Sequence, residues 1–166
     1  PAPFACMLLA DMGTDVLRIE RPGRAGLERG ATLRSRRNVV MDLKEESNVR
    51  SAQELAARAD VPVEGFRPGV MEKLDLGPES LHKMNPRLIY ARMTGWGQSG
   101  PRALLAGHDI NYISLTGALD AIGPAGGEPT IPVNLVGDYG GGALYLVAGV
   151  LAALFVARRT QRGEGV

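Results

Sequence analysis

The sequence has one cysteine, almost no net charge and only two histidines among its 166 residues. A single thiol, Cys6, excludes an internal disulfide bond and a metal site built from several cysteines. Lysine and arginine number 19 and aspartate and glutamate number 18, which gives a net charge of +1. The chain therefore lacks the basic excess of a nucleic-acid-binding protein and the acidic block of a solvating tail. The single thiol and the lack of a membrane signal make the cytoplasm the expected compartment.

Glycine and proline are abundant, with 22 and 11 residues, so many tight turns are expected. Hydrophobic residues make up 45% of the chain and charged residues 22%, as in an ordinary globular domain. One stretch, 140–157, carries no charge and reaches the length of a transmembrane helix. Because glycines interrupt it and Asp138, Arg158, Arg159 and Arg162 flank it, a helix buried in the core is favoured over a membrane span.

Apolar strands and helices alternate along the chain. Helices are predicted over 4–12, 46–59, 68–74, 78–84, 107–120 and 140–157, and strands over 15–20, 38–43, 60–64 and 88–94. The rest is expected to be loop: 23–37 is a surface loop or short helix, 121–133 is a loop, and 134–138 closes it before the last helix. This alternation predicts an α/β fold with a parallel sheet and helices on both faces. No dinucleotide-binding glycine fingerprint follows any strand.

The densest polar cluster is Gly107-His108-Asp109-Ile110-Asn111-Tyr112. Histidine suits proton transfer near neutral pH, and the positive end of a helix dipole favours its neutral, basic form. His108 is therefore a candidate general base. The alternative is that His108 merely caps a helix, with Asp109 as an acid in its first turn.

Asp138 precedes three consecutive glycines, 140–142, at the expected start of the last helix. Glycines there would let a ligand approach backbone N–H groups, although Asp138 is also an ordinary helix cap. The turn 95–101 with Trp96 is either a lid that stacks on a base or a tight turn anchored by its tryptophan. Basic residues near two strand ends either hold phosphates or form a solvated face; they are Arg21, Arg34, Arg36, Arg37 and Lys44.

Several strings resemble the family III CoA-transferases, also called the CaiB/BaiF superfamily. They are PFACMLLADMG (3–13), VLRIERP (16–22), FRPGV (66–70) and LIYARMTGWGQSGP (88–101). Two further strings, GHDINY (107–112) and NLVGDYGGG (134–142), resemble the alpha-methylacyl-CoA racemase branch of that superfamily. The strings follow the family's order, and the resemblance extends over nearly the whole chain.

The resemblance implies a Rossmann-like large domain that binds CoA. Residues 1–166 would be a truncated part of that domain, with the family's first strand and its C-terminal half lying outside them. Because that C-terminal half is missing, the segment alone is expected to be inactive. Family members are interlocked homodimers with the active site at the subunit interface. The implied ligand is an acyl-CoA, with no cofactor beyond the CoA of the substrate, no metal, no nucleic acid and no membrane.

The racemase branch interconverts 2-methylacyl-CoA enantiomers by moving the α-proton, and its catalytic residues match His108 and Asp138. The positions that match the family's CoA contacts are Arg21, Met41, Asp42, Leu43, Lys44, Gly107, Asp109, Ile110, Asn111 and Tyr112. Inversion needs one base on each face of the planar enolate, a task that an imidazole and a carboxylate can share. Backbone N–H groups at the helix start beyond Asp138 are expected to stabilise the enolate oxygen.

Two alternatives to the racemase remain open. In a family III CoA-transferase the aspartate that matches Asp138 is the nucleophile, and no base is needed at His108. A non-catalytic CoA-binding fragment is the third interpretation. The string around His108 favours the racemase.

Overall fold

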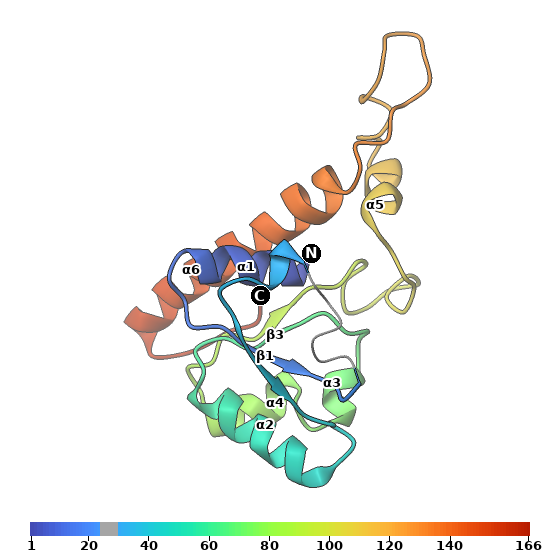
Figure 1. Ribbon diagram of the computed structural model, residues 1–166. Helices are drawn as coiled ribbons and strands as arrows, with labels where there is room; N and C mark the ends of the chain where they lie inside the picture. The colour runs from blue at the N-terminus through green and yellow to red at the C-terminus, as the bar shows by residue number, and fades with distance from the viewer. Residues whose placement is uncertain (24–29) are drawn as a thin grey trace.

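The computed structural model describes residues 1–23 and 30–166 as helices packed around short parallel strands. The elements are α1 (Ala2–Asp11), β1 (Leu17–Glu20), η1 (Ala31–Leu33), β2 (Arg37–Val40), α2 (Glu46–Arg58), β3 (Val63–Glu64), α3 (Val70–Lys73), α4 (Pro78–Met84), β4 (Ala91–Arg92), α5 (Asp109–Leu115), η2 (Leu135–Ala143) and α6 (Leu144–Thr160). Figure 1 shows α1 and α6 on one side of the strands and α2, α3 and α4 on the other. The predicted α/β fold is thus confirmed, while part of the predicted segment 23–37, residues 24–29, lies outside the described residues.

The strands pair in parallel in two groups. β1 pairs with β2 in the register that sets Leu17 beside Arg37, and β3 pairs with β4 in the register that sets Val63 beside Ala91. A parallel bridge between Tyr90 and Gly165 adds the C-terminal residues to the second group. Parallel pairing requires crossover connections, and α3 and α4 lie in the connection from β3 to β4.

All four strands are shorter than predicted, and Pro62 explains the late start of β3. The N–H groups of Ile89 and Ala91 donate to the carbonyls of Asp60 and Pro62, both at 3.0 Å. In this register the N–H of residue 62 would donate to the Ile89 carbonyl, but proline has no N–H. The regular ladder therefore begins only at Val63.

The core lies on both faces of the extended segment 88–91, which runs into β4. Ile89 and Ala91 pack toward α1 and α6, in clusters that include Leu9 and Val150. Leu88 and Tyr90 pack on the opposite face, in a cluster with Ala52 of α2 and Leu81 of α4. All are buried, as expected for a parallel strand covered by helices on both sides.

The last helix begins earlier than predicted. Segment 134–138 was expected to be the end of a loop, but a π-helix, η2, already starts at Leu135 and runs without a break into α6. The Tyr139 N–H donates to the Asn134 carbonyl at 3.3 Å, five residues back, which is the π-helical spacing. Asp138 therefore lies inside a helix and is not its cap.

The three glycines of η2 fit this wider helix. A Cβ atom at Gly140 would lie 2.9 Å from the Leu135 carbonyl oxygen, and one at Gly141 would lie 3.0 Å from the Val136 oxygen. Both distances are shorter than an ordinary van der Waals contact. The glycines are thus explained by the helix's own backbone, and the expected approach of a ligand to a helix start at 140–142 is wrong.

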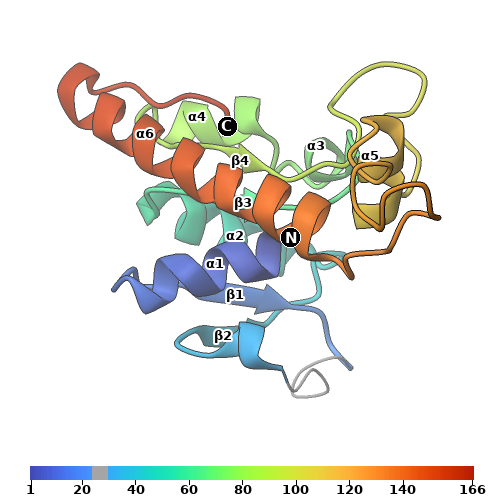
Figure 2. The same cartoon turned by 90° about the horizontal axis from the view of Figure 1, so that it is seen from above.

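The segment Leu135–Thr160 is the one described helix that is long and apolar enough to cross a membrane by length and composition. Its α6 part buries one face, including Leu146, Val150 and Ala157, against the core. Figure 2 shows α6 lying beside α1 across the strands. This is the arrangement expected of a core helix, although the opposite face of α6 remains exposed.

Candidate active site

His108 stands at the start of α5. Its backbone N–H donates to the Asn111 side chain at 2.9 Å, and its carbonyl accepts the Asn111 N–H at 2.8 Å. These reciprocal bonds tie His108 to the first turn of the helix. The helix is shorter than the predicted 107–120, because it ends at Leu115 and Gly117 adopts a positive φ of 78°. The His108 side chain is 82% exposed.

Asp138 faces His108 from η2. The distance from His108 Nδ1 to Asp138 Oδ2 is 3.8 Å, and the Asp138 side chain is only 9% exposed. Its second oxygen, Oδ1, is buried and has no hydrogen-bond partner among the described residues. The structure therefore brings together an exposed imidazole and a buried carboxylate, the two residues predicted as bases, from segments 30 positions apart in the chain.

The carboxylate of Asp109 bonds to backbone and points away from solvent. Its Oδ2 accepts the N–H of Gly137 at 2.6 Å and the N–H of Asp138 at 2.8 Å. Asp109 was expected to contact CoA, and its buried side chain leaves only its backbone for such a contact. Sequence reasoning missed this link, since nothing in a single sequence connects residue 109 to residues 28 and 29 positions further on.

Tyr112 is enclosed by the turn that contains Trp96. The two rings meet edge to face with centroids 5.0 Å apart, and Trp96 Nε1 donates to the Ala106 carbonyl at 3.3 Å. A Cβ at Gly95 would lie 2.2 Å from the Tyr112 hydroxyl, so this position excludes any side chain. Of the two interpretations of the turn, the structure supports the tight turn anchored by its tryptophan. Burial and the nearby charge of Asp138 raise the pKa of Tyr112.

The other residues of the predicted CoA site lie in two places, after the strands β1 and β2 and in the α5 segment. Arg21 follows β1, Met41 follows β2, and the Met41 N–H donates to the Glu20 carbonyl at 2.8 Å. Asp42 turns the chain into α2, accepting the Lys44 N–H at 3.1 Å. Ile110, Asn111 and Gly107 flank His108 in the α5 segment. Ligands of parallel α/β sheets bind at this edge of the strands.

Two of the basic residues near the strand ends form ion pairs at the surface. Arg34 binds the Asp11 carboxylate, with Nη2 and Oδ2 2.5 Å apart, and Arg37 binds Asp15 at the same distance. For Arg34 and Arg37 these pairs favour the solvated face, one of the two interpretations of the basic residues. Lys44 and Arg21 are exposed.

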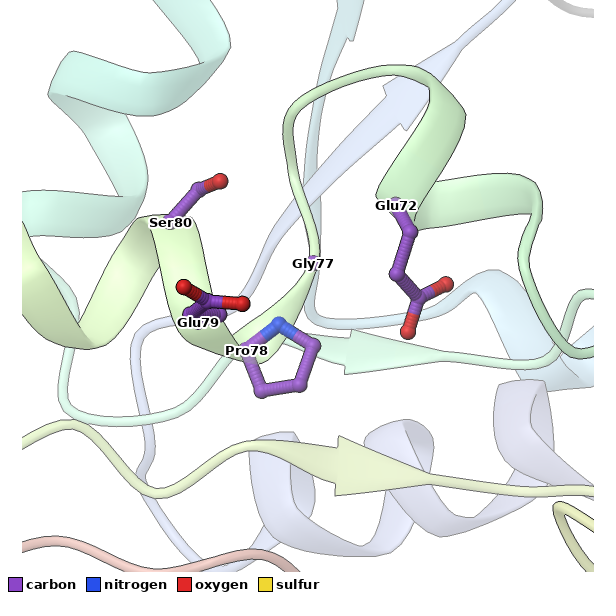
Figure 3. A pocket seen from close by; sticks show the side chains of 5 residues that line it. All are labelled: Glu72, Gly77, Pro78, Glu79 and Ser80. Carbon is purple, nitrogen blue, oxygen red and sulfur yellow. The ribbon is translucent and has the colours of Figure 1, made fainter.

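Two shallow cavities occur away from the His108–Asp138 pair. The first, of about 320 Å³, is lined by Glu72, Gly77, Pro78, Glu79 and Ser80. Figure 3 shows its side chains on α3, on α4 and on the turn between these helices. None of them belongs to the predicted site. Among the described residues, no group of three histidine, cysteine or acidic side chains is arranged to hold a metal ion.

Parallel strands with flanking helices, and a histidine and a buried aspartate at one site, define an α/β enzyme-like domain. The sequence profile of CoA-transferase family III matches residues 1–166. The chain therefore belongs to this family, as the resemblance of its motifs predicts.

Relatives within the family carry two kinds of activity in their names. The chain is 49% identical to human alpha-methylacyl-CoA racemase over 165 residues, which are 99% of the chain and 43% of the relative. It is 33% identical to mouse succinyl-CoA:glutarate CoA-transferase, covering 97% of the chain and 40% of that protein. A crystal structure of a CaiB/BaiF family protein from Brucella suis superposes with a TM-score of 0.86 at 32% identity, over 99% of the chain and 48% of that protein. The chain thus spans less than half the length of these relatives.

Proposed function

We propose that the complete protein racemises 2-methylacyl-CoA thioesters by moving the α-proton between His108 and Asp138. The observation that carries the proposal is the pairing of these two side chains, with Nδ1 and Oδ2 3.8 Å apart. The 49% identity to human alpha-methylacyl-CoA racemase supports the choice of substrate.

The two groups suit opposite faces of an enolate. One base removes the α-proton, the thioester oxygen takes up the charge, and the other group, protonated, returns a proton to the opposite face. The substrate α-carbon must sit between them, within about 3 Å of each proton-transferring atom, and so the two groups must be about 6 Å apart. At 3.8 Å they are too close, and because the His108 ring is exposed and Asp138 is buried, His108 swings away when substrate enters.

The oxyanion stabiliser must differ from the one expected from the sequence. The N–H groups of Gly137 and Asp138 are occupied by Asp109, and the Tyr139 N–H is bonded within η2. The amides beyond Asp138 lie inside a helix and are not available to an enolate oxygen. The start of α5 supports an alternative, because Asp109 and Ile110 are its first residues and their amides precede the first intrahelical bonds.

The test is α-hydrogen exchange. The complete protein is incubated in deuterated water with each enantiomer of a 2-methylacyl-CoA, without an acceptor acid, and deuterium at the α-carbon is followed by NMR. Both enantiomers should exchange, His108→Ala should abolish exchange from one of them, and Asp138→Ala should abolish exchange from the other. No exchange by the wild type would refute the racemase proposal.

A CoA-transferase is the second candidate, and the buried Asp138 Oδ1 without a partner favours it. In that reaction Asp138 attacks the thioester carbonyl, CoA leaves as the thiolate, and an acyl anhydride forms. The relative that supports this alternative is succinyl-CoA:glutarate CoA-transferase. CoA transfer to an added carboxylic acid, without exchange at the α-carbon, would establish it; binding of CoA without either reaction would leave a binding module.

A further inference from the structure

One carboxylate joins the two segments that carry the proposed bases. Asp109 follows His108 directly in the chain, is 2% exposed, and its Oδ2 accepts the amides of Gly137 and Asp138 at 2.6 and 2.8 Å. Asp109 is thus attached covalently to one base and through a hydrogen bond to the backbone of the other. No other described residue has such a link to both.

The two hydrogen bonds that the Asp109 carboxylate accepts are of the strong, charge-assisted type. The first N–H groups of a helix lack intrahelical partners, and the positive end of its dipole attracts an anion. Asp109 supplies that anion to η2 in a buried setting, where charge-assisted bonds are hard to replace by water. Packing supports them, because a Cβ at Gly137 would lie only 3.1 Å from the Asp109 carbonyl oxygen and 3.3 Å from its Cγ.

We propose that Asp109 is a positioning residue that keeps Asp138 within reach of the substrate α-carbon. Its loss affects proton transfer only on the face of the substrate that Asp138 protonates. The proposal rests on the racemase function. His108 keeps its own support, the reciprocal bonds with Asn111, which do not involve the Asp109 carboxylate.

Loss of the Asp109 carboxylate should therefore affect the two enantiomers differently. Without the Asp109 carboxylate, the part-buried Gly137 amide and the buried Asp138 amide lose their acceptor and the start of η2 shifts, which moves Asp138. A displacement of the order of 1 Å costs about 100-fold in rate. His108 still removes and returns the proton on its own face, so the enantiomer that presents its α-proton to His108 continues to exchange with solvent while its inversion slows by the same factor.

The experiment measures exchange and inversion of both enantiomers in deuterated water with the complete Asp109→Ala protein. The expected result is near-wild-type exchange from the enantiomer served by His108, and an about 100-fold loss both of exchange from the other enantiomer and of inversion. Asp109→Asn should recover most of the lost rate, because one amide oxygen can accept both N–H groups that Oδ2 accepts now. Asp120→Ala, at an exposed acid in the loop beyond α5, is the matched control.

Gly137→Ala provides a second variant if Asp109→Ala does not fold. Its Cβ would lie 3.1 Å from the Asp109 carbonyl oxygen and 3.3 Å from Asp109 Cγ, so it should displace the start of η2 while both bonding partners remain. The same asymmetry is expected from it. Equal losses for both enantiomers in either folded variant, or no recovery with Asp109→Asn, would refute the positioning role while the racemase stands. A wild-type protein without exchange at either enantiomer would refute both proposals together.

Discussion

At the residue scale, the buried hydroxyl of Tyr90 makes a hydrogen bond whose contribution to stability can be measured. Tyr90 is 1% exposed, and its hydroxyl donates to the Leu76 carbonyl at 2.8 Å. Burial, followed by the charge of Glu64, raises the pKa of Tyr90 to about 12, so the hydroxyl keeps its proton at neutral pH. Tyr90, the residue before β4, thus connects this strand segment to the turn between α3 and α4.

Tyr90→Phe should lower the free energy of unfolding by about 1 to 2 kcal/mol, because it leaves the buried Leu76 carbonyl without a donor. Urea denaturation followed by circular dichroism measures this change. Tyr145→Phe is the matched control, because Tyr145 is 78% exposed and its change should leave stability unaltered. Equal effects of the two substitutions would contradict the role assigned to the Tyr90 hydroxyl.

Glu64 makes stability depend on pH. Its side chain is 7% exposed and its Oε1 lies 3.5 Å from Arg92 Nε, while burial raises the pKa of the carboxyl above its ordinary value of 4.5 despite the Phe66 N–H and Arg92. Between pH 4.5 and the raised pKa, the folded state holds more protons than the unfolded state at this position. Glu64 therefore favours folding most at low pH and loses that contribution as the pH rises through the raised pKa.

The prediction concerns wild type against Glu64→Gln, whose amide does not titrate. The free energy of unfolding of the wild type minus that of the variant should be highest below pH 4.5 and should decline toward pH 7. Urea titrations at a series of pH values give this difference. The contributions of the other titrating groups, which both proteins share, largely cancel in it. Parallel stability curves for the two proteins would show that burial does not shift the pKa of Glu64.

At the scale of elements, the sequence predicts helices and strands where their signals are local. Pro78–Met84 is helical over the residues predicted, because proline starts it and its apolar positions follow the helical period. α1 ends where Gly13 predicts, since the glycine adopts φ +97°. The glycines 140–142 are helical as predicted, but the π-helical start of η2 before them escapes prediction, because the contacts that hold it come from Asp109, 28 positions earlier in the chain.

Gly140→Ala tests the π-helix. In an α-helix this change stabilises by up to about 1 kcal/mol, since alanine has the higher helix propensity. In η2 the added Cβ would lie 2.9 Å from the Leu135 carbonyl, so we expect the opposite sign, a destabilisation of about 1 kcal/mol. The comparison is Ala152→Gly on the exposed face of α6, which should lose about 1 kcal/mol by propensity alone. Stabilisation by Gly140→Ala in thermal unfolding would refute the π-helical backbone.

At the scale of the whole molecule, the parallel α/β architecture could be predicted because alternating periodicities repeat along the chain. The site could be predicted only as single residues. His108 and Asp138 were recognised by their motifs, but their spacing and the buried Asp109 link depend on how α5 and η2 pack. Residues 30 positions apart meet through tertiary structure, which no local pattern in one sequence encodes.

The exposed face of α6 leads to a prediction for the chain as a whole. Five large apolar side chains are at least 45% exposed along this helix: Leu144, Tyr145, Leu151, Phe155 and Val156. They follow helical spacing and so form one stripe opposite the buried face. A contiguous apolar stripe in water favours association, because burying it removes apolar surface from solvent. We therefore expect the 166-residue chain to self-associate.

Sedimentation velocity at increasing micromolar concentrations of the 166-residue chain should show a rising weight-average sedimentation coefficient. Leu151→Glu with Phe155→Glu should suppress the rise, because two charges in the stripe would have to be desolvated on association. Ser47→Glu with Ser51→Glu on the exposed side of α2 makes the same change of charge away from the stripe and should leave association intact. If both pairs suppress it equally, net charge and not the α6 stripe controls association; a wild type that stays monomeric throughout would show that the stripe is too small to hold two chains together.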